Sequence, residues 1–160
     1  MFHSTTVLGE DDYQRLKASI DGLVRSANAR VVFLVDKAGQ LIAAGGAVSD
    51  LDTTSLASLT AGNIAATGGI AKLLRENEFA TQYHEGKDAH VHIQVVKNRV
   101  ILVVIFDARS SLGLVRLRVR KTAEELTAIF DDMNARPPSV RDAANFTEIT
   151  DEDIDNLFND

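Results

Sequence analysis

The chain has 160 residues, of which 45% are hydrophobic, and it carries a formal net charge of −6. This length fits one globular domain with a core of its own and a tail. The acidic balance argues against a general nucleic-acid binder, because affinity for phosphates requires a basic surface. The absence of cysteine excludes disulfides, thiolate zinc sites and cysteine nucleophiles, and it fits a reducing compartment.

The first residues, 1–9, are expected to form a flexible N-terminus. They lack the basic and then apolar pattern of a secretory signal. Residues 55–71 form an uncharged run of nearly membrane length, but its Ser, Thr, Asn and Gly content makes it too polar to insert. We therefore expect a cytoplasmic protein without integral membrane contact.

A helix and a hairpin open the predicted domain. Residues 10–26 place apolar side chains at the spacing of an amphipathic helix. Residues 31–35, Val-Val-Phe-Leu-Val, form a continuous apolar run that predicts a strand covered on both faces. Residues 36–39 are typical of a turn, so residues 40–44 return as the hairpin partner. Gly45 and Gly46 are predicted to end this second strand.

The longest predicted helix spans residues 52–78 and has two unlike faces. One arc carries bulky side chains and is predicted to face the core of the protein. The opposite arc is small and nearly neutral, and we expect it to contact another protein. Close approach of that partner would offset the cost of Gly62, Gly68 and Gly69, each about 0.8–1 kcal/mol relative to alanine in a helix interior. The core arc consists of Leu56, Leu59, Asn63, Thr67, Ile70, Leu73 and Leu74, and the small arc of Ala57, Ser58, Ala61, Ala65, Gly68, Gly69 and Lys72.

Three further strands are predicted after this helix. Residues 79–83 form a short strand before a turn at residues 85–88. Within residues 89–96, β-branched side chains alternate with His90, His92 and Gln94, which predicts a strand with one solvent-exposed side. A tight turn at residues 97–98 leads to a buried strand at residues 100–106, so the three strands should form a meander.

The segment 110–133 is ambiguous over residues 115–120, which alternate like a strand. Over its whole length the apolar side chains fall on one helical arc, and this length favours a helix that Pro137 and Pro138 terminate. The resulting order is αββαβββα. It predicts an α/β sandwich over residues 10–133, in which a mostly antiparallel five-stranded sheet has helices on both faces.

A tail follows the predicted domain. Residues 134–147 contain prolines and charges with little periodicity, which predicts a flexible linker. Thr150 and Asp153 then resemble a capping box, so residues 148–160 are predicted to form an acidic amphipathic helix. Its apolar face carries Ile154, Leu157 and Phe158, which are candidate contacts in the groove of a partner. The alternative is a solvated acidic end.

No residue pattern predicts an enzyme site, and neither a metal nor another cofactor is expected. The chain lacks the GxxxxGK[ST] motif of a P-loop. His90 and His92 have a spacing that a metal could use, but solvated histidines on a sheet are commoner. Arg109 could act as an arginine finger, although local ion pairing explains its position as well. A basic run is interpreted as a solvated helix face, with contact to an acidic partner or lipid as the alternative; it comprises Arg116, Arg118, Arg120 and Lys121.

Three stretches carry a family resemblance: VVFLVDKAGQLI, DTTSLASLTAGNIAATGGIAKLL and VILVVIFDARSSLGLVRLRV. Together they resemble the bacterial Roadblock/dynein light chain family, whose members include regulators of small Ras-family GTPases. The similarity covers about residues 10–133, and the ending DIDNLF resembles the C-terminal helix of some members. The resemblance implies the Roadblock fold, which is profilin-like.

The resemblance also implies a function in cell polarity and gliding motility, with enrichment at a cell pole. A homodimer, with sheets joined edge to edge and long helices side by side, would bind one GTP-loaded GTPase. It would activate hydrolysis without an arginine finger, by bringing the GTPase's own arginine and glutamine into place. The interface positions that match are Ala57, Ser58, Thr60, Ala61, Ala65, Gly68, Gly69 and Lys72.

In the family, the tail helix is associated with binding the GTPase away from the nucleotide and with promoting nucleotide exchange. The matching contacts here are Ile154, Leu157 and Phe158. The alternative to an activator is a Roadblock scaffold or adaptor, which binds a GTPase or a polarity protein without accelerating hydrolysis.

Overall fold

The computed structural model describes residues 8–136. Within them the element order is the predicted αββαβββα, which confirms the expected fold class. Two elements, the first helix and the last strand, have the predicted bounds. The elements are α1 (Glu10–Ser26), β1 (Val31–Asp36), β2 (Leu41–Gly46), α2 (Thr53–Leu73), β3 (Thr81–Glu85), β4 (His90–Val96), β5 (Val100–Phe106) and α3 (Leu112–Ala135).

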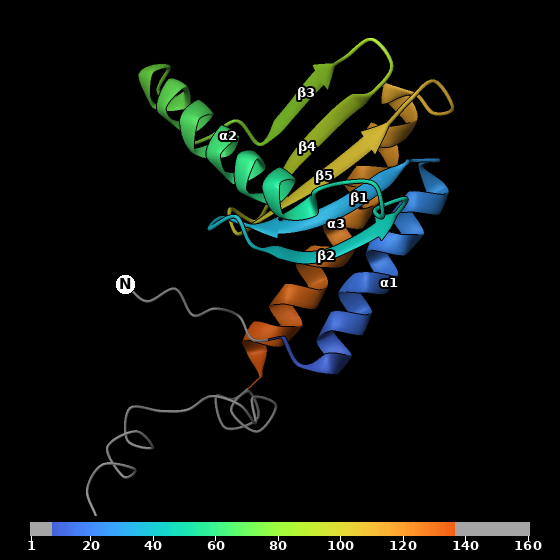
Figure 1. Cartoon of the computed structure of the whole chain (residues 1–160). Helices are drawn as coiled ribbons and strands as arrows, with labels where there is room; N and C mark the ends of the chain where they lie inside the picture. Colours follow the sequence, from blue (N-terminus) through green and yellow to red (C-terminus); the bar gives the residue numbers. More distant parts are fainter. Residues whose placement is uncertain (1–7, 137–160) are drawn as a thin grey trace, which may run out of the picture.

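The strands form one sheet in the order β2-β1-β5-β4-β3, and each neighbouring pair is antiparallel. The hairpin of β1 with β2 and the meander of β3, β4 and β5 are both as predicted. Helices α1 and α3 cover one face of the sheet, and α2 lies on the other (Figure 1). The central strand β5 and its neighbour β1 are therefore covered on both sides.

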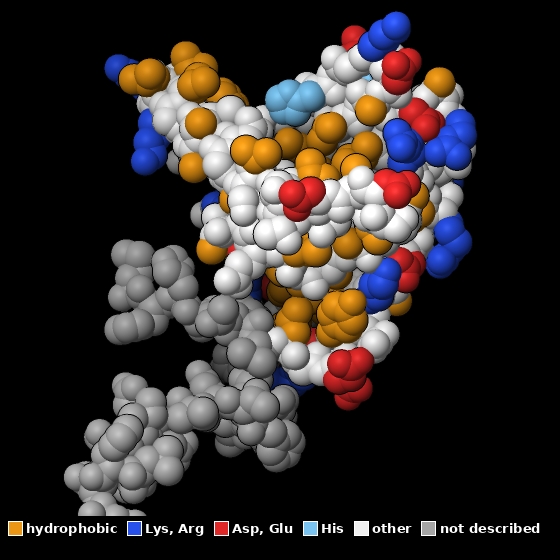
Figure 2. Space-filling view, viewed as in Figure 1, with side chains coloured by type: hydrophobic (Ala, Val, Ile, Leu, Met, Phe, Trp, Pro, Cys, Tyr) orange, Lys and Arg blue, Asp and Glu red, His pale blue; other side chains and the backbone are white. Residues whose placement is uncertain are grey.

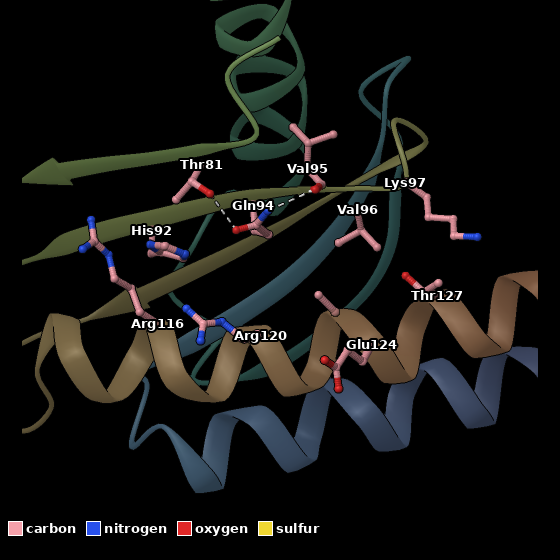
Figure 3. A pocket seen from close by; sticks show the side chains of 11 residues that line it. Thr81, His92, Gln94, Val95, Val96, Lys97, Arg116, Arg120, Glu124 and Thr127 are labelled. Atoms are coloured by element: carbon pink, nitrogen blue, oxygen red, sulfur yellow. Dashed lines mark hydrogen bonds between the residues drawn. The ribbon is translucent and has the colours of Figure 1, made fainter. Parts of the chain in front are cut away.

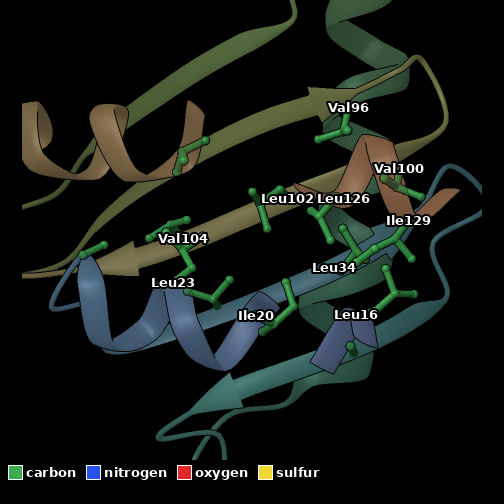
Figure 4. Packing of buried hydrophobic residues seen from close by; sticks show 14 of the residues in the cluster. Leu16, Ile20, Leu23, Leu34, Val96, Val100, Leu102, Val104, Leu126 and Ile129 are labelled. Carbon is green, nitrogen blue, oxygen red and sulfur yellow. The ribbon is translucent and has the colours of Figure 1, made fainter. Parts of the chain in front are cut away.

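The larger core lies between the sheet and the helices α1 and α3 (Figure 4). Alternate residues of the central strands, such as Leu34 and Leu102, point into this layer and are fully buried. They meet the apolar stripe of α1, represented by Leu16 and Ile20, which are also fully buried. The opposite strand residues, such as Phe33, belong to a second and smaller cluster beneath α2.

The prediction that one side of β4 faces solvent is wrong. His92 is 1% exposed, because α3 extends across β4 and covers this side of the strand. His90 is half-buried, and its ring centroid lies 5.3 Å from that of Phe106. The period-two pattern identified the strand correctly, but the polar side chains lie under a helix instead of in open solvent.

Local interactions set the ends of several elements. The Asp52 carboxylate caps α2, accepting a hydrogen bond from the Ser55 N–H at 3.0 Å. Helix α2 ends at Leu73, five residues before the predicted end, and Arg75 then adopts a left-handed backbone with φ 61°. Gly46 closes β2 with φ +89°, where an added Cβ would collide with the Arg30 backbone. The pair Gly45-Gly46 thus belongs to the strand end.

The end of α3 lies slightly beyond the predicted linker boundary, since the helix continues to Ala135. Arg136 donates a hydrogen bond to the buried carboxylate of Asp12 at 2.5 Å and so ties the end of α3 to α1. Residues 1–7, the rest of the predicted linker and the predicted tail helix, with Ile154, Leu157 and Phe158, lie outside the described residues. Among residues 8–136, no helix is long and apolar enough to cross a membrane.

Candidate protein-interaction surface

Helix α2 is held to the sheet in two different ways along its length. Its first half packs through small side chains, since Ala57 is fully buried and Thr60 is 8% exposed. Further along, Asn63 donates a hydrogen bond to the Gln82 side chain at 2.9 Å, and Gln82 donates to the Thr67 hydroxyl at 2.8 Å. This polar network connects α2 to β3. Figure 1 shows the C-terminal end of α2 extending away from the sheet.

The predicted core arc of α2 holds at Leu56, which packs against the smaller cluster, but it is wrong for the four bulky residues that follow. Leu59 is 71% exposed and Leu73 is 85% exposed, and Ile70 and Leu74 are exposed as well. The small residues Ala57 and Thr60 lie against the sheet instead. Small side chains let the helix axis lie close to the sheet, which leaves its leucines at the side of the helix.

An apolar groove lies between α2 and the strands that α2 leaves uncovered. It has a volume of about 210 Å³, and Leu59 forms part of its helical wall. Figure 2 shows hydrophobic side chains gathered on the far end of α2 and in the hollow between this helix and the sheet. Because exposed apolar patches with a concave shape mark interaction sites, we treat the groove and α2 as one candidate surface. The groove is lined by Phe33, Leu56, Leu59, Thr60, Asn63, His84, Val91, Ile93, Val103 and Ile105.

The predicted interface residues of α2 divide into accessible and inaccessible positions. Ala57 and Thr60 are buried within the protomer, so they support α2 from below. The predicted place of Ala57 on the outer face is therefore wrong, because the sheet lies directly beneath it. Half-buried positions are Ala61 and Gly68, and the exposed ones are Ser58, Ala65, Gly69 and Lys72.

The glycines of α2 have no explanation within the protomer. A Cβ atom added at Gly62, Gly68 or Gly69 would meet no atom within 4 Å. Each glycine still lowers helix stability by about 0.8–1 kcal/mol relative to alanine. The space around them is open to a surface from outside the protomer, as a contact with another protein would require.

Arg109 forms an ion pair with Asp107, two residues earlier in the chain. Its Nε donates to Asp107 Oδ1 at 3.1 Å and its Nη2 to Oδ2 at 3.2 Å. Hydrogen bonds from the Arg109 side chain and backbone hold the pKa of the Asp107 carboxyl below its usual range, against a smaller opposing effect of burial. This geometry matches the local ion pairing proposed as the alternative to an arginine finger.

The basic run on α3 is largely the solvated face that we predicted, because Arg116, Arg120 and Lys121 are exposed and Arg118 is half-buried. Arg116 and Arg120 line a cavity against β4 together with the buried His92. The sequence contained a signal for this arrangement, because Arg116 and Arg120 are spaced i, i+4 and point in one direction.

Within residues 8–136 no group of three or more His, Asp or Glu side chains could hold a metal ion.

Comparison with known proteins gives consistent relatives. The Roadblock/LC7 domain family matches residues 17–106. The structure of Myxococcus xanthus MglB is 56% identical with a TM-score of 0.76, over 79% of this chain and 95% of that one. The gliding protein MglB from Thermus thermophilus is 30% identical with a TM-score of 0.76, over 82% and 99%.

A further structure, described as MglB with tetrameric arrangement, is 30% identical with a TM-score of 0.76, over 82% of this chain and 98% of that one. No curated protein matches the chain at a significant level.

Proposed function

Because this chain belongs to the Roadblock/LC7 domain family, we propose that it regulates an MglA-like small Ras-family GTPase in cell polarity and gliding motility. The observation that carries the proposal is the 56% identity to Myxococcus xanthus MglB over 79% of the chain. In our proposal the protein binds the GTP-loaded GTPase and accelerates hydrolysis. It acts in the cytoplasm, with enrichment at a cell pole.

We propose a homodimer as the active form. The apolar side of α2 supports this, since Leu59 and Leu73 are exposed beside the open groove. β3 also supports it, because this strand lies at the edge of the sheet and has backbone groups free to pair with a second copy. The tetrameric arrangement described for a relative that is 30% identical fits a family whose members associate with themselves.

The composition of α2 supports activation without an arginine finger. Lys72 is the only charged residue between Thr53 and Leu73, so this helix offers a partner shape and small side chains but no guanidinium. Arg109 is paired with Asp107. We therefore propose that the protein has no catalytic site of its own and that binding reorganises the catalytic groups of the GTPase.

The test is GTP turnover by an MglA-like GTPase from the same organism, with and without this protein. The double variant Ala65→Arg/Gly69→Arg places two long cations on the exposed face of α2, where Gly69 has open space. We expect wild-type protein to accelerate turnover and the variant to lose the effect with unchanged thermal unfolding. The matched control is Gly113→Arg/Ala128→Arg on α3, at exposed positions on the opposite face of the sheet, which should activate normally.

Two results would contradict the proposal. Tight binding without a change in turnover would favour the scaffold or adaptor, and equal activation by the α2 and α3 variants would exclude α2 as the contact.

For the tail we propose a separate contact with the GTPase, away from the nucleotide, that promotes nucleotide exchange. Deletion of residues 147–160, which removes Ile154, Leu157 and Phe158, should weaken GTPase binding and slow exchange while leaving the oligomeric state unchanged. If the deletion changes neither the affinity for the GTPase nor the rate of nucleotide exchange, the tail is a solvated acidic end.

A further inference from the structure

A cavity of about 690 Å³ lies between the sheet and α3, on the face of the sheet opposite α2. Its walls come from β4, from Thr81 of β3 and from one side of α3, with the β4–β5 turn at one end. This volume is within the range of small-molecule sites, about 300–1,000 Å³. The proposed contacts on α2 do not use this cavity, and of the proposed dimer edge β3 it is Thr81 that reaches its wall.

A buried imidazole is the first unexplained group in this cavity. His92 is 1% exposed and lines the cavity, and its Nδ1 has no hydrogen-bond partner among the described residues. Buried polar atoms are nearly always paired, because an unpaired one loses its hydration without compensation. Burial lowers the pKa of His92, and the charge of Arg116 lowers it further, so the ring is neutral at pH 7. A neutral imidazole has one N–H group to donate.

The second feature is a pair of guanidinium groups on α3, which belong to exposed residues that line the cavity. Arg116 and Arg120 are one helical turn apart on α3; Figure 3 shows the Arg116 side chain extending toward β4 beside the His92 ring, and the Arg120 side chain lying below this ring along α3. Like charges at this spacing repel each other. Neither has an ion pair within residues 8–136, whereas Lys97 at the rim is paired with Asp131 at 2.9 Å. An anion between the two arginines would remove this repulsion.

Polar groups elsewhere in the cavity indicate which further chemical groups a bound molecule could carry. Glu124 and Thr127 continue along α3 from Arg120 and can pair with hydroxyl groups. The carboxylate of Glu124 disfavours a second anionic group at that end. Gln94 is less available, because its amide oxygen accepts from Thr81 at 2.9 Å and its nitrogen donates to the Val95 carbonyl at 3.2 Å.

We propose that this cavity binds a small phosphorylated molecule, with its phosphate held by Arg116, Arg120 and His92 and its hydroxyl groups directed toward Glu124 and Thr127. Phosphate fits better than a single carboxylate, because its oxygens can accept from two guanidinium forks and an imidazole together. The ligand is larger than free phosphate, since the cavity extends well beyond the three anion-binding side chains.

The experiment is a titration of the full-length protein with ribose 5-phosphate, followed by the imidazole ¹⁵N signals of His92 in NMR spectra. We expect a saturable shift of His92, with ribose alone producing none. The double variant Arg116→Gln/Arg120→Gln should bind at least about tenfold more weakly. Lys121→Gln removes an exposed cation of α3 that does not line the cavity, and it should bind within about twofold of wild type.

Three results would overturn the proposal. The first is the absence of a saturable His92 shift with ribose 5-phosphate. The second is that the Lys121→Gln variant and the double arginine variant weaken binding of ribose 5-phosphate equally. The third is a His92 shift produced by a poly-glutamate peptide but not by the sugar phosphate. The last would assign the basic side of α3 to an acidic protein. Unfolding curves of each variant show whether a loss of binding reflects a loss of fold.

Discussion

Leu59→Glu on α2 should separate the proposed dimer into folded monomers. Complete burial of a leucine contributes about 1.5–3 kcal/mol. Leu59 is 71% exposed in the protomer. Covering that fraction contributes roughly 1–2 kcal/mol per protomer and roughly 2–4 kcal/mol in a two-fold interface, where each copy contributes the same residue. The dimer dissociation constant should therefore rise roughly 30- to 1,000-fold.

The assay is sedimentation velocity over a concentration series, combined with urea unfolding of the monomeric variant. The substitution lies on the surface, so the free energy of unfolding of the protomer should stay within about 0.5 kcal/mol of wild type. Leu117→Glu is the matched control, because Leu117 is 58% exposed on α3 at the opposite face of the sheet. If Leu59→Glu associates like wild type, or if Leu117→Glu dissociates equally, the assignment of the apolar side of α2 to the dimer is refuted.

Three further predictions test the environment of α2 and the helix caps. Gly68→Ala should raise the unfolding free energy of the monomeric Leu59→Glu protein by about 0.8–1 kcal/mol, as measured in urea, and should weaken self-association in the wild-type background; stronger association would contradict the proposed close contact. Ser111→Ala should lower the unfolding free energy by about 1 kcal/mol, because its hydroxyl accepts a helix N–H at 3.2 Å, and unchanged urea unfolding would exclude this cap. Hydrogen bonds from Ser55 lower the pKa of Asp52, so its stabilising effect is fully present above the unfolded-state value of about 3.9 and is lost as the pH falls through the lower folded-state value. Asp52→Asn should therefore unfold with a shallower dependence on pH in this acidic range, and identical acid unfolding curves would contradict the cap.

Periodicity was sufficient for the fold class because most elements have a strong local pattern, although the third strand, predicted at residues 79–83, lies at Thr81–Glu85. The continuous run of β1 predicted a strand covered on both faces, and both Val32 and Phe33 are buried. In the segment 110–133 the apolar arc over the whole length outweighed the short strand-like alternation, and the structure has one helix there, from Leu112 to Ala135. The spacing of residues along the chain determines which of them share a face of a helix or strand, whatever the element later packs against.

The surroundings of each face could not be predicted in the same way. The spacing in α2 placed Leu59 and Leu73 on one side correctly, but the assumption that bulky residues face the protomer core failed. Small residues face the sheet because close packing was available there, and the bulky residues were left for a surface outside the protomer. Likewise, the pattern of β4 could not show that α3 would cover His92, since this contact joins segments distant in sequence.

Single-turnover hydrolysis tests the central claim most directly. An MglA-like GTPase from the same organism is loaded with GTP and mixed with a molar excess of the full-length protein, and phosphate release is followed in time. We predict at least about a tenfold acceleration, which corresponds to about 1.4 kcal/mol of transition-state stabilisation, and its loss in Ala65→Arg/Gly69→Arg. An unchanged hydrolysis rate while the two proteins are bound would contradict the account.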